Sequence, residues 1–223
     1  LVQLCDDALA TFAPGPGRDA IGAVRGKLST PLTVTVAGGV SSGKSTLVNA
    51  LLGQQVAAVD AGECTRVVTE FRYGVQERAE IHGTDGTVTT VPLERGRVPS
   101  SLGRPIDEVA HVVVHLSNAL LTELAVVDTP GLNTVTEANE QSTTAFLGVG
   151  GREGQVTADS IGRADTLVFL LPVLRQADSD VLRGFAHLFG DSQLSAASTV
   201  AVLSKIDRLV KGGDPLAAAA PIA

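Results

Sequence analysis

The chain has 223 residues, of which 44% are hydrophobic and 18% charged, so it is large enough to bury a sizeable core. Its formal net charge of −7 argues against general nucleic-acid binding, which usually needs a basic stripe. Two cysteines provide no disulfide framework, no signal peptide is visible, and no apolar run reaches the ~18 residues of a membrane span, so we expect a cytoplasmic protein.

The N-terminal residues predict two short helices. Residues 1–13 place apolar side chains at near-helical spacing, the sequence PGPG at 14–17 interrupts this pattern, and a second helical stretch follows at about 18–29. We therefore assign residues 1–30 to a helical segment that precedes the main domain.

The remaining residues alternate short β-branched strands with helices. We predict helices at 44–52 and 178–190, long loops at 94–108 and 131–157, and strands at 32–37, 66–74, 78–83, 87–93, 109–116, 121–128, 165–172 and 198–204. Apolar strands that alternate with helices indicate an α/β fold, with a mixed, mostly parallel sheet and helices on both faces. Because the chain stops soon after its last strand, we expect the domain at 31–223 to be truncated at its C-terminal end.

A phosphate-binding loop follows the first strand. Residues 38–46 read GGVSSGKST and match the pattern G-x-x-x-x-G-K-[ST] between a strand and a helix. The backbone N–H groups of such a loop form an anion nest, the lysine places its charge on the β- and γ-phosphates, and the serine hydroxyl after it binds Mg²⁺. We therefore place these residues at the nucleotide: Gly38, Ser42, Gly43, Lys44, Ser45 and Thr46.

The sequence DTPG at 128–131 ends another apolar strand. In a GTPase, Asp128 would hold Mg²⁺ through water and the Gly131 N–H would contact the γ-phosphate. A threonine that closes over Mg²⁺ is expected between the first helix of the domain and the next strand, where Thr65 in GECTR is a better candidate than Thr69.

The sequence SKID at 204–207 stands at the end of a strand where GTPases carry [NT]-K-x-D. Asp207 would accept two hydrogen bonds from guanine N1–H and N2–H₂, a donor pair that adenine lacks, so it would reject ATP. The Lys205 stem would lie along the base. Ser204 departs from Asn or Thr, although its hydroxyl can still make one hydrogen bond.

These motifs together resemble those of the dynamin superfamily. The sequence GxxSSGKST followed by a switch threonine and DTPGL carries the resemblance, and TLVNALLG and GECTRVVTEFRYG look closest to bacterial dynamin-like proteins. Among these, the chain resembles the actinobacterial group that includes the isoniazid-inducible dynamin-like proteins. The resemblance covers roughly residues 1–210 and implies a P-loop GTPase fold.

The resemblance also implies how the enzyme works. Leu132 occupies the position where Ras-like enzymes place the glutamine that orients water. In its place, Ser41 and backbone oxygens around Asp60–Gly62 would coordinate a monovalent cation, Na⁺ or K⁺. Thr65 would position Mg²⁺ and the attacking water, so the catalytic set is Ser41, Lys44 and Thr65, with Ser45, Thr65 and Asp128 at the metal.

As a member of this family, the protein would bind GTP or GDP with Mg²⁺ and hydrolyse GTP. Family members associate through their GTPase faces and remodel membranes through a stalk and lipid-binding tip, which we expect to lie outside this chain. We therefore expect a protein that is peripheral at the inner face of the cell membrane and does not bind nucleic acid.

Two other functions stay open. An Era-like GTPase that acts on ribosomes would need a basic RNA-binding domain, against which the acidic balance counts. A nucleotide-gated scaffold that binds GTP with little turnover is compatible with Leu132 and Ser204.

Overall fold

The computed structural model describes residues 1–57, 67–99, 101–131, 164–172 and 198–208. The predicted helix at 178–190 and nearly all of the loop at 131–157 lie outside these ranges. The helices are α1 (Val2–Thr11), α2 (Pro16–Lys27) and α3 (Lys44–Leu52). The strands are β1 (Leu32–Gly38), β2 (Thr69–Tyr73), β3 (Arg78–Gly83), β4 (Val88–Val91), β5 (Val109–Leu116), β6 (Leu124–Asp128), β7 (Thr166–Leu171) and β8 (Thr199–Leu203).

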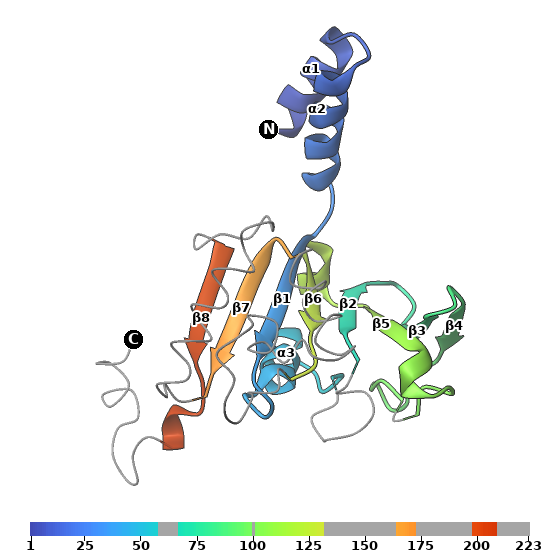
Figure 1. Cartoon of the computed structure of the whole chain (residues 1–223), viewed down its shortest axis with the longest axis vertical. Coiled ribbons are helices and arrows are strands. Elements are labelled where there is room, and N and C mark those ends of the chain that lie inside the picture. Colours follow the sequence, from blue (N-terminus) through green and yellow to red (C-terminus); the bar gives the residue numbers. More distant parts are fainter. Residues whose placement is uncertain (58–66, 100, 132–163, 173–197, 209–223) are drawn as a thin grey trace, which may run out of the picture.

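The first two helices pack against each other as a hairpin that stands away from the sheet (Figure 1). The two helices are joined by an ion pair of 2.6 Å between Arg25 Nε and Asp6 Oδ1. The second helix begins earlier than predicted, at Pro16, because a proline at the first helical position loses no intrahelical hydrogen bond. Among the described helices, none is long and apolar enough to cross a bilayer.

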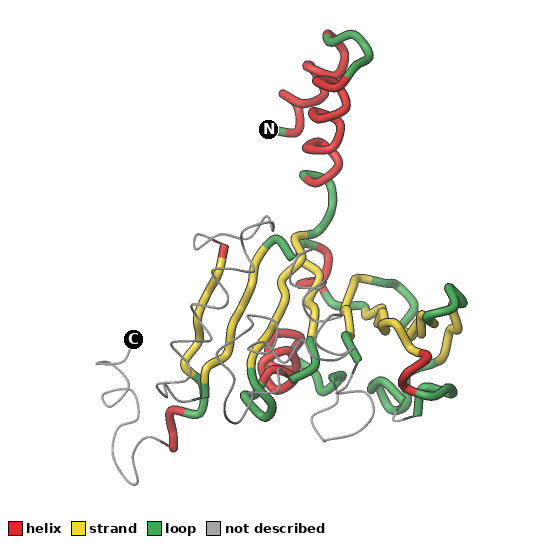
Figure 2. The backbone as a smooth tube through the Cα atoms, in the orientation of Figure 1, coloured by secondary structure: helices red, strands yellow, loops and turns green. Residues whose placement is uncertain are grey.

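The eight strands form one mixed sheet in the order β4-β3-β5-β2-β6-β1-β7-β8. The parallel pairs are β1–β6, β1–β7, β7–β8 and β2–β5, and the antiparallel pairs are β2–β6, β3–β4 and β3–β5. The predicted mixed and mostly parallel α/β sheet is therefore confirmed. Figure 2 shows the four parallel strands β6, β1, β7 and β8 side by side, below the hairpin.

The predicted strand at 121–128 is wrong in its first part. Ala119–Thr122 form a 3₁₀ turn, and the strand begins only at Leu124. Asn118 explains the difference, because its side chain accepts a hydrogen bond of 3.0 Å from the Leu120 N–H and so caps the turn.

One face of the sheet packs against α3. Val48 of α3 is fully buried, together with Val36, Phe71 and Val126 of the strands β1, β2 and β6. This packing fixes the helix beneath the end of β1, so the loop between them has a rigid support on both sides.

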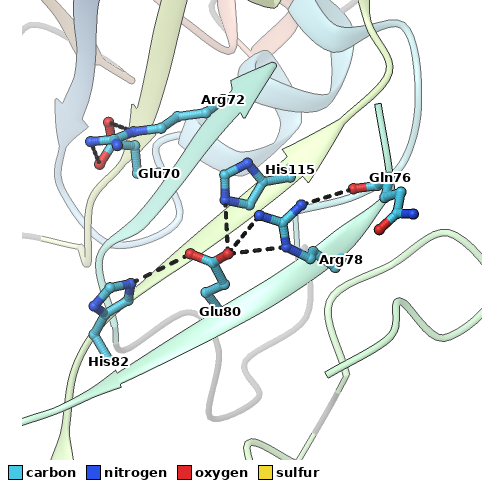
Figure 3. A network of polar contacts seen from close by, with 7 residues as sticks. All are labelled: Glu70, Arg72, Gln76, Arg78, Glu80, His82 and His115. Carbon is cyan, nitrogen blue, oxygen red and sulfur yellow. Dashed lines mark hydrogen bonds and ion pairs between the residues drawn. The ribbon is translucent and has the colours of Figure 1, made fainter. Parts of the chain in front are cut away.

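The opposite face carries charged and histidine side chains where β2, β5 and β3 lie together (Figure 3). Glu80 lies 2.7 Å from Arg78 Nη2 and 3.4 Å from His115 Nε2. The hydrogen bond from Arg78, followed by the interaction with His115, lowers the pKa of Glu80 below its usual value. In the described ranges, no group of three His, Cys, Asp or Glu side chains has the arrangement of a metal site. His82 Nε2 and His115 Nε2 are buried there without a hydrogen-bond partner among the described residues, so the cluster is a polar face that is only partly satisfied.

Candidate nucleotide-binding site

The three sequence motifs meet at one edge of the sheet. The strands β1, β6 and β8 all run in the same direction, so their carboxyl ends, at Gly38, Asp128 and Leu203, lie at the same edge. In Figure 1 this is the lower edge, opposite the hairpin. Ligands of open α/β sheets usually bind outside these strand ends, so this edge is where a nucleotide is expected.

Close packing determines the residue type at the start of the loop. A Cβ on Gly38 would lie 2.6 Å from the backbone oxygen of Leu170 on the neighbouring strand β7. Gly43, with φ of 100°, caps the N-terminus of α3. Both positions therefore require glycine, and the loop is held close enough to the sheet for its N–H groups to converge.

Lys44 lies folded over this loop. Its Nζ donates hydrogen bonds to the carbonyl oxygens of Gly38 at 3.2 Å and Gly39 at 3.0 Å, and its side chain is buried. Burial lowers the pKa of Lys44, and the nearby charge of Asp128 opposes this change. A partly desolvated ammonium group is therefore positioned to interact with phosphate oxygens.

Asp128 is a buried carboxylate whose ionised form is disfavoured by burial. Burial raises its pKa to about 6, although a hydrogen bond with the Ser45 side chain and the charge of Lys44 both lower it. Among the described residues, no hydrogen-bond partner reaches Asp128 Oδ1. Because Mg²⁺ prefers carboxylate, hydroxyl and water oxygens, this unpaired oxygen beside the Ser45 hydroxyl fits a magnesium site.

The DTPG turn rests directly on the phosphate loop. The Thr129 hydroxyl donates a hydrogen bond of 2.9 Å to the Val36 carbonyl, which fixes the turn to β1. A Cβ on Gly131 would lie 2.8 Å from Val40 Cγ2 and 2.9 Å from Val40 Cα. The Gly131 backbone is thus in contact with the loop that would carry the γ-phosphate.

The SKID segment is also tied to the phosphate loop. The Ser204 hydroxyl donates a hydrogen bond of 2.8 Å to the Ser42 carbonyl. Lys205 is half-buried, and Asp207 is exposed in the short 3₁₀ turn Ile206–Arg208. An exposed carboxylate at this edge is accessible to a base.

The other residues predicted at the site are exposed or lie outside the described ranges. Ser41 and Thr46 are exposed, and Ser41 has a left-handed φ of 58°. Thr65, Asp60–Gly62 and Leu132 lie outside the described residues. The alternative threonine, Thr69, is buried in β2 opposite Asp128 of β6. Because it is part of the sheet, Thr69 cannot act as a closing switch residue.

Sequence reasoning missed two contacts of this site. It predicted Ser204 only as a residue near the base and gave no role to Asn49 of α3, whose buried side chain is hydrogen-bonded to Val56 and Ala57. The signal for Asn49 was limited, because an asparagine inside a helical pattern indicates only that its side chain has found local partners.

Comparison with known proteins agrees with this arrangement. Residues 34–206 match the Dynamin family. Isoniazid-induced protein IniC of Mycobacterium tuberculosis is 36% identical over 197 residues, which are 87% of this chain and 37% of that protein. The bacterial dynamin-like protein of Nostoc punctiforme is 32% identical over 121 residues, which are 48% of this chain and 18% of that protein. The chain therefore spans well under half the length of these relatives.

Similarity of fold extends over almost the whole chain. A solved structure of an oligomerised bacterial dynamin pair superposes with a TM-score of 0.60 at 19% identity, covering 99% of this chain and 33% of that one. The family match includes the phosphate loop, DTPG and most of SKID. The chain belongs to the dynamin family, and the part matched is its GTPase domain.

Proposed function

We propose that this protein binds GTP and GDP with Mg²⁺ and hydrolyses GTP by attack of water on the γ-phosphorus. The observation that carries the proposal is the meeting of Lys44, Ser45 and the buried carboxylate of Asp128, whose Oδ1 has no hydrogen-bond partner among the described residues, at one edge of the sheet. A buried cation, a hydroxyl and a buried carboxylate there match the needs of a metal-bound triphosphate.

The proposed roles follow from position. Lys44 contacts the β- and γ-phosphates, and the Gly131 N–H contacts the γ-phosphate. Ser45 and Asp128, joined by Thr65, would hold Mg²⁺, which when bound supplies positive charge against the phosphate oxygens. The remaining phosphate contacts come from the backbone of the loop, at Gly38, Ser42, Gly43 and Thr46.

Base selection and water positioning complete the proposal. Asp207 selects guanine, Lys205 covers the base, and Ser204 holds their segment on the phosphate loop. Ser41 would take part in binding Na⁺ or K⁺, and Thr65 would orient the attacking water.

A paired titration tests the proposal. Fluorescent GTP and ATP analogues are added to the full-length protein with and without Mg²⁺, alongside Asp207→Ala and Lys44→Ala. We expect GTP preference, its loss in Asp207→Ala, and loss of binding or turnover in Lys44→Ala. Equal binding of ATP by the wild type would refute guanine selection, and wild-type turnover by Lys44→Ala would refute the phosphate site.

We further propose that the whole protein self-associates through its GTPase face and couples hydrolysis to remodelling of the inner face of the cell membrane. The support is the family and the solved bacterial dynamin pair, which is described as a mechanism for long-range sensing and tethering of membranes. Turnover by the full-length protein should rise with protein concentration and with anionic lipid vesicles. GTP binding without turnover under both conditions would instead indicate a nucleotide-gated scaffold.

A further inference from the structure

We infer that Asn49 is a positioning residue for GTP hydrolysis. Its side chain connects the phosphate-binding helix to the chain segment leading to Thr65. The inference rests on the proposed function. It starts from three hydrogen bonds made by a single buried side chain.

The Asn49 amide makes three hydrogen bonds to the backbone of two consecutive residues, Val56 and Ala57. Its Oδ1 accepts hydrogen bonds from the N–H groups of Val56 at 2.9 Å and Ala57 at 2.8 Å. Its Nδ2 donates a hydrogen bond of 3.0 Å to the Ala57 carbonyl. Asn49, Val56 and Ala57 are all buried. The Val56 N–H also donates to the Gln54 carbonyl at 3.1 Å, so losing the Asn49 side chain would remove partners chiefly from the desolvated N–H and carbonyl groups of Ala57.

The local sequence explains why the chain returns to Asn49. Gly53 ends α3 in a left-handed conformation with φ of 66°, which turns the chain back along the helix. The Gln54 N–H then donates to the Asn49 carbonyl at 3.2 Å. Both the main chain and the side chain of Asn49 therefore hold the segment that follows the helix.

The position of Asn49 on α3 gives this contact a functional meaning. Asn49 follows Ser45 by four residues, so the two side chains lie on the same face of the helix. Ser45 is the proposed Mg²⁺ ligand at the first turn, and Ala57 directly precedes residues 58–66, which include Thr65. One side chain thus fixes the start of that segment to the helix that presents Ser45.

The other end of the same segment is anchored to the second proposed metal ligand. Val67 and Val68 are buried, and Thr69 pairs with Asp128 in the register of β2 against β6. The two ends of the segment that carries Thr65 are therefore fixed to the two elements that carry Ser45 and Asp128. We infer that Asn49 sets the geometry of one of these two anchors.

Asn118 offers a matched control. This asparagine lies outside α3 but contacts its last residue, because its Nδ2 donates a hydrogen bond of 2.7 Å to the Leu52 carbonyl. Its Oδ1 accepts a hydrogen bond from the Leu120 N–H. These contacts stabilise the end of the helix and do not involve Val56 or Ala57. Asn118→Ala therefore tests for a loss of stability without a loss of the proposed anchor.

The experiment compares Asn49→Ala, Asn49→Asp and Asn118→Ala in the full-length protein. Single-turnover GTP hydrolysis is measured per bound nucleotide, together with GTP affinity and thermal unfolding. We expect both alanine variants to unfold at lower temperature. Only Asn49→Ala should lose about tenfold or more in single-turnover rate at nearly unchanged affinity, since misplacing a reacting group is costly.

Asn49→Asp keeps the acceptor for two N–H groups and loses the donated hydrogen bond, so it should fold and show a rate between those of the wild type and Asn49→Ala. If Asn49→Ala does not fold, a wild-type rate in Asn49→Asp would overturn the inference. A wild-type rate in Asn49→Ala, or an equal loss in Asn118→Ala, would overturn it as well.

Amide hydrogen exchange tests the role of Asn49 independently of GTP hydrolysis. Peptides covering residues 54–66 should gain protection when the wild type binds a non-hydrolysable GTP analogue, and this gain should be lost in Asn49→Ala and kept in Asn118→Ala. A wild type that binds the analogue without hydrolysing GTP would refute the proposed function, while the exchange result would still decide the role of Asn49. Equal protection in all three proteins would refute that role.

Discussion

The Ser204 hydroxyl donates a hydrogen bond of 2.8 Å to the Ser42 carbonyl across a separation of 162 residues in the chain. A residue in the left-handed region adjoins each end of this bond, Ser41 with φ of 58° and Lys205 with φ of 57°. Non-glycine residues rarely adopt this conformation, and they do so mainly where the surrounding structure holds them. The bond therefore joins two strained turns, one for the phosphates and one for the base.

Ser204→Ala should weaken GTP binding about fivefold, the equivalent of one net hydrogen bond of about 1 kcal/mol. Ser204→Thr keeps the hydroxyl and should bind GTP like the wild type. Both affinities can be measured by titration of a fluorescent GTP analogue in the presence of Mg²⁺. Unchanged affinity in Ser204→Ala would mean that the two turns hold their conformation without this bond.

Asp128→Asn should stabilise the nucleotide-free protein while it impairs Mg²⁺-dependent nucleotide binding. Burial raises the pKa of Asp128 from 3.8 to about 6, so the folded protein binds this proton more tightly than the unfolded chain does. The ionised carboxylate therefore costs stability above about pH 6, and the asparagine removes that cost, by up to about 3 kcal/mol. The gain should shrink as pH falls from 6 towards 3.8.

Thermal unfolding from pH 4 to 8 without nucleotide checks this prediction. The control is Asp107→Asn, which alters an exposed carboxylate and should have little effect. An Asp128→Asn protein that is less stable than the wild type above pH 6 would show that the carboxylate is not penalised by burial.

Much of this site could be predicted from local sequence, because its motifs sit at strand ends and strand ends are marked by glycine and aspartate. The strand at 32–37 and the helix at 44–52 agree closely with the structure, and Gly53 ends the helix as expected. Contacts between distant segments were not predictable in this way. The Ser204–Ser42 bond depends on strand order, and a sequence pattern does not show that β8 lies next to β7 or that β2 pairs antiparallel with β6.

The strand predicted at 121–128 illustrates a second limit. Leu121 and Leu124 are both apolar, so periodicity does not separate them, yet they belong to a 3₁₀ turn and a strand respectively. The deciding contact comes from Asn118, three residues before the predicted strand, through a hydrogen bond that hydrophobic patterns do not register.

Gly131→Ala should weaken binding of GTP more than binding of GDP. The added Cβ would lie 2.8 Å from Val40 Cγ2, 2.9 Å from Val40 Cα and 3.2 Å from Val40 N, so it would push the DTPG turn away from the phosphate loop. Adding Val40→Ala removes only the side-chain contact, so the double variant should recover only part of the loss. Titration with both nucleotides measures the difference, and full recovery would show that the backbone of Val40 does not limit the approach.

Glu80→Gln should lower the stability of the protein at neutral pH by less than about 1 kcal/mol, as expected for a partly exposed ion pair. Its carboxylate accepts two hydrogen bonds from Arg78, at 2.7 Å and 3.0 Å, and lies beside His115 and His82 (Figure 3). These contacts lower the pKa of Glu80 from 4.5, so their stabilisation is present above that pH and is lost as pH falls through the folded-state value.

The difference between Glu80→Gln and the wild type should therefore decrease below about pH 4.5, as measured by urea unfolding at several pH values. Glu77→Gln is the matched control, because this exposed carboxylate directly precedes β3 and should change little. Salt should reduce the effect of Glu80→Gln, since a screened ion pair contributes less. A difference that persists unchanged at acid pH would mean that Glu80 stabilises the sheet by packing, and not through its charge.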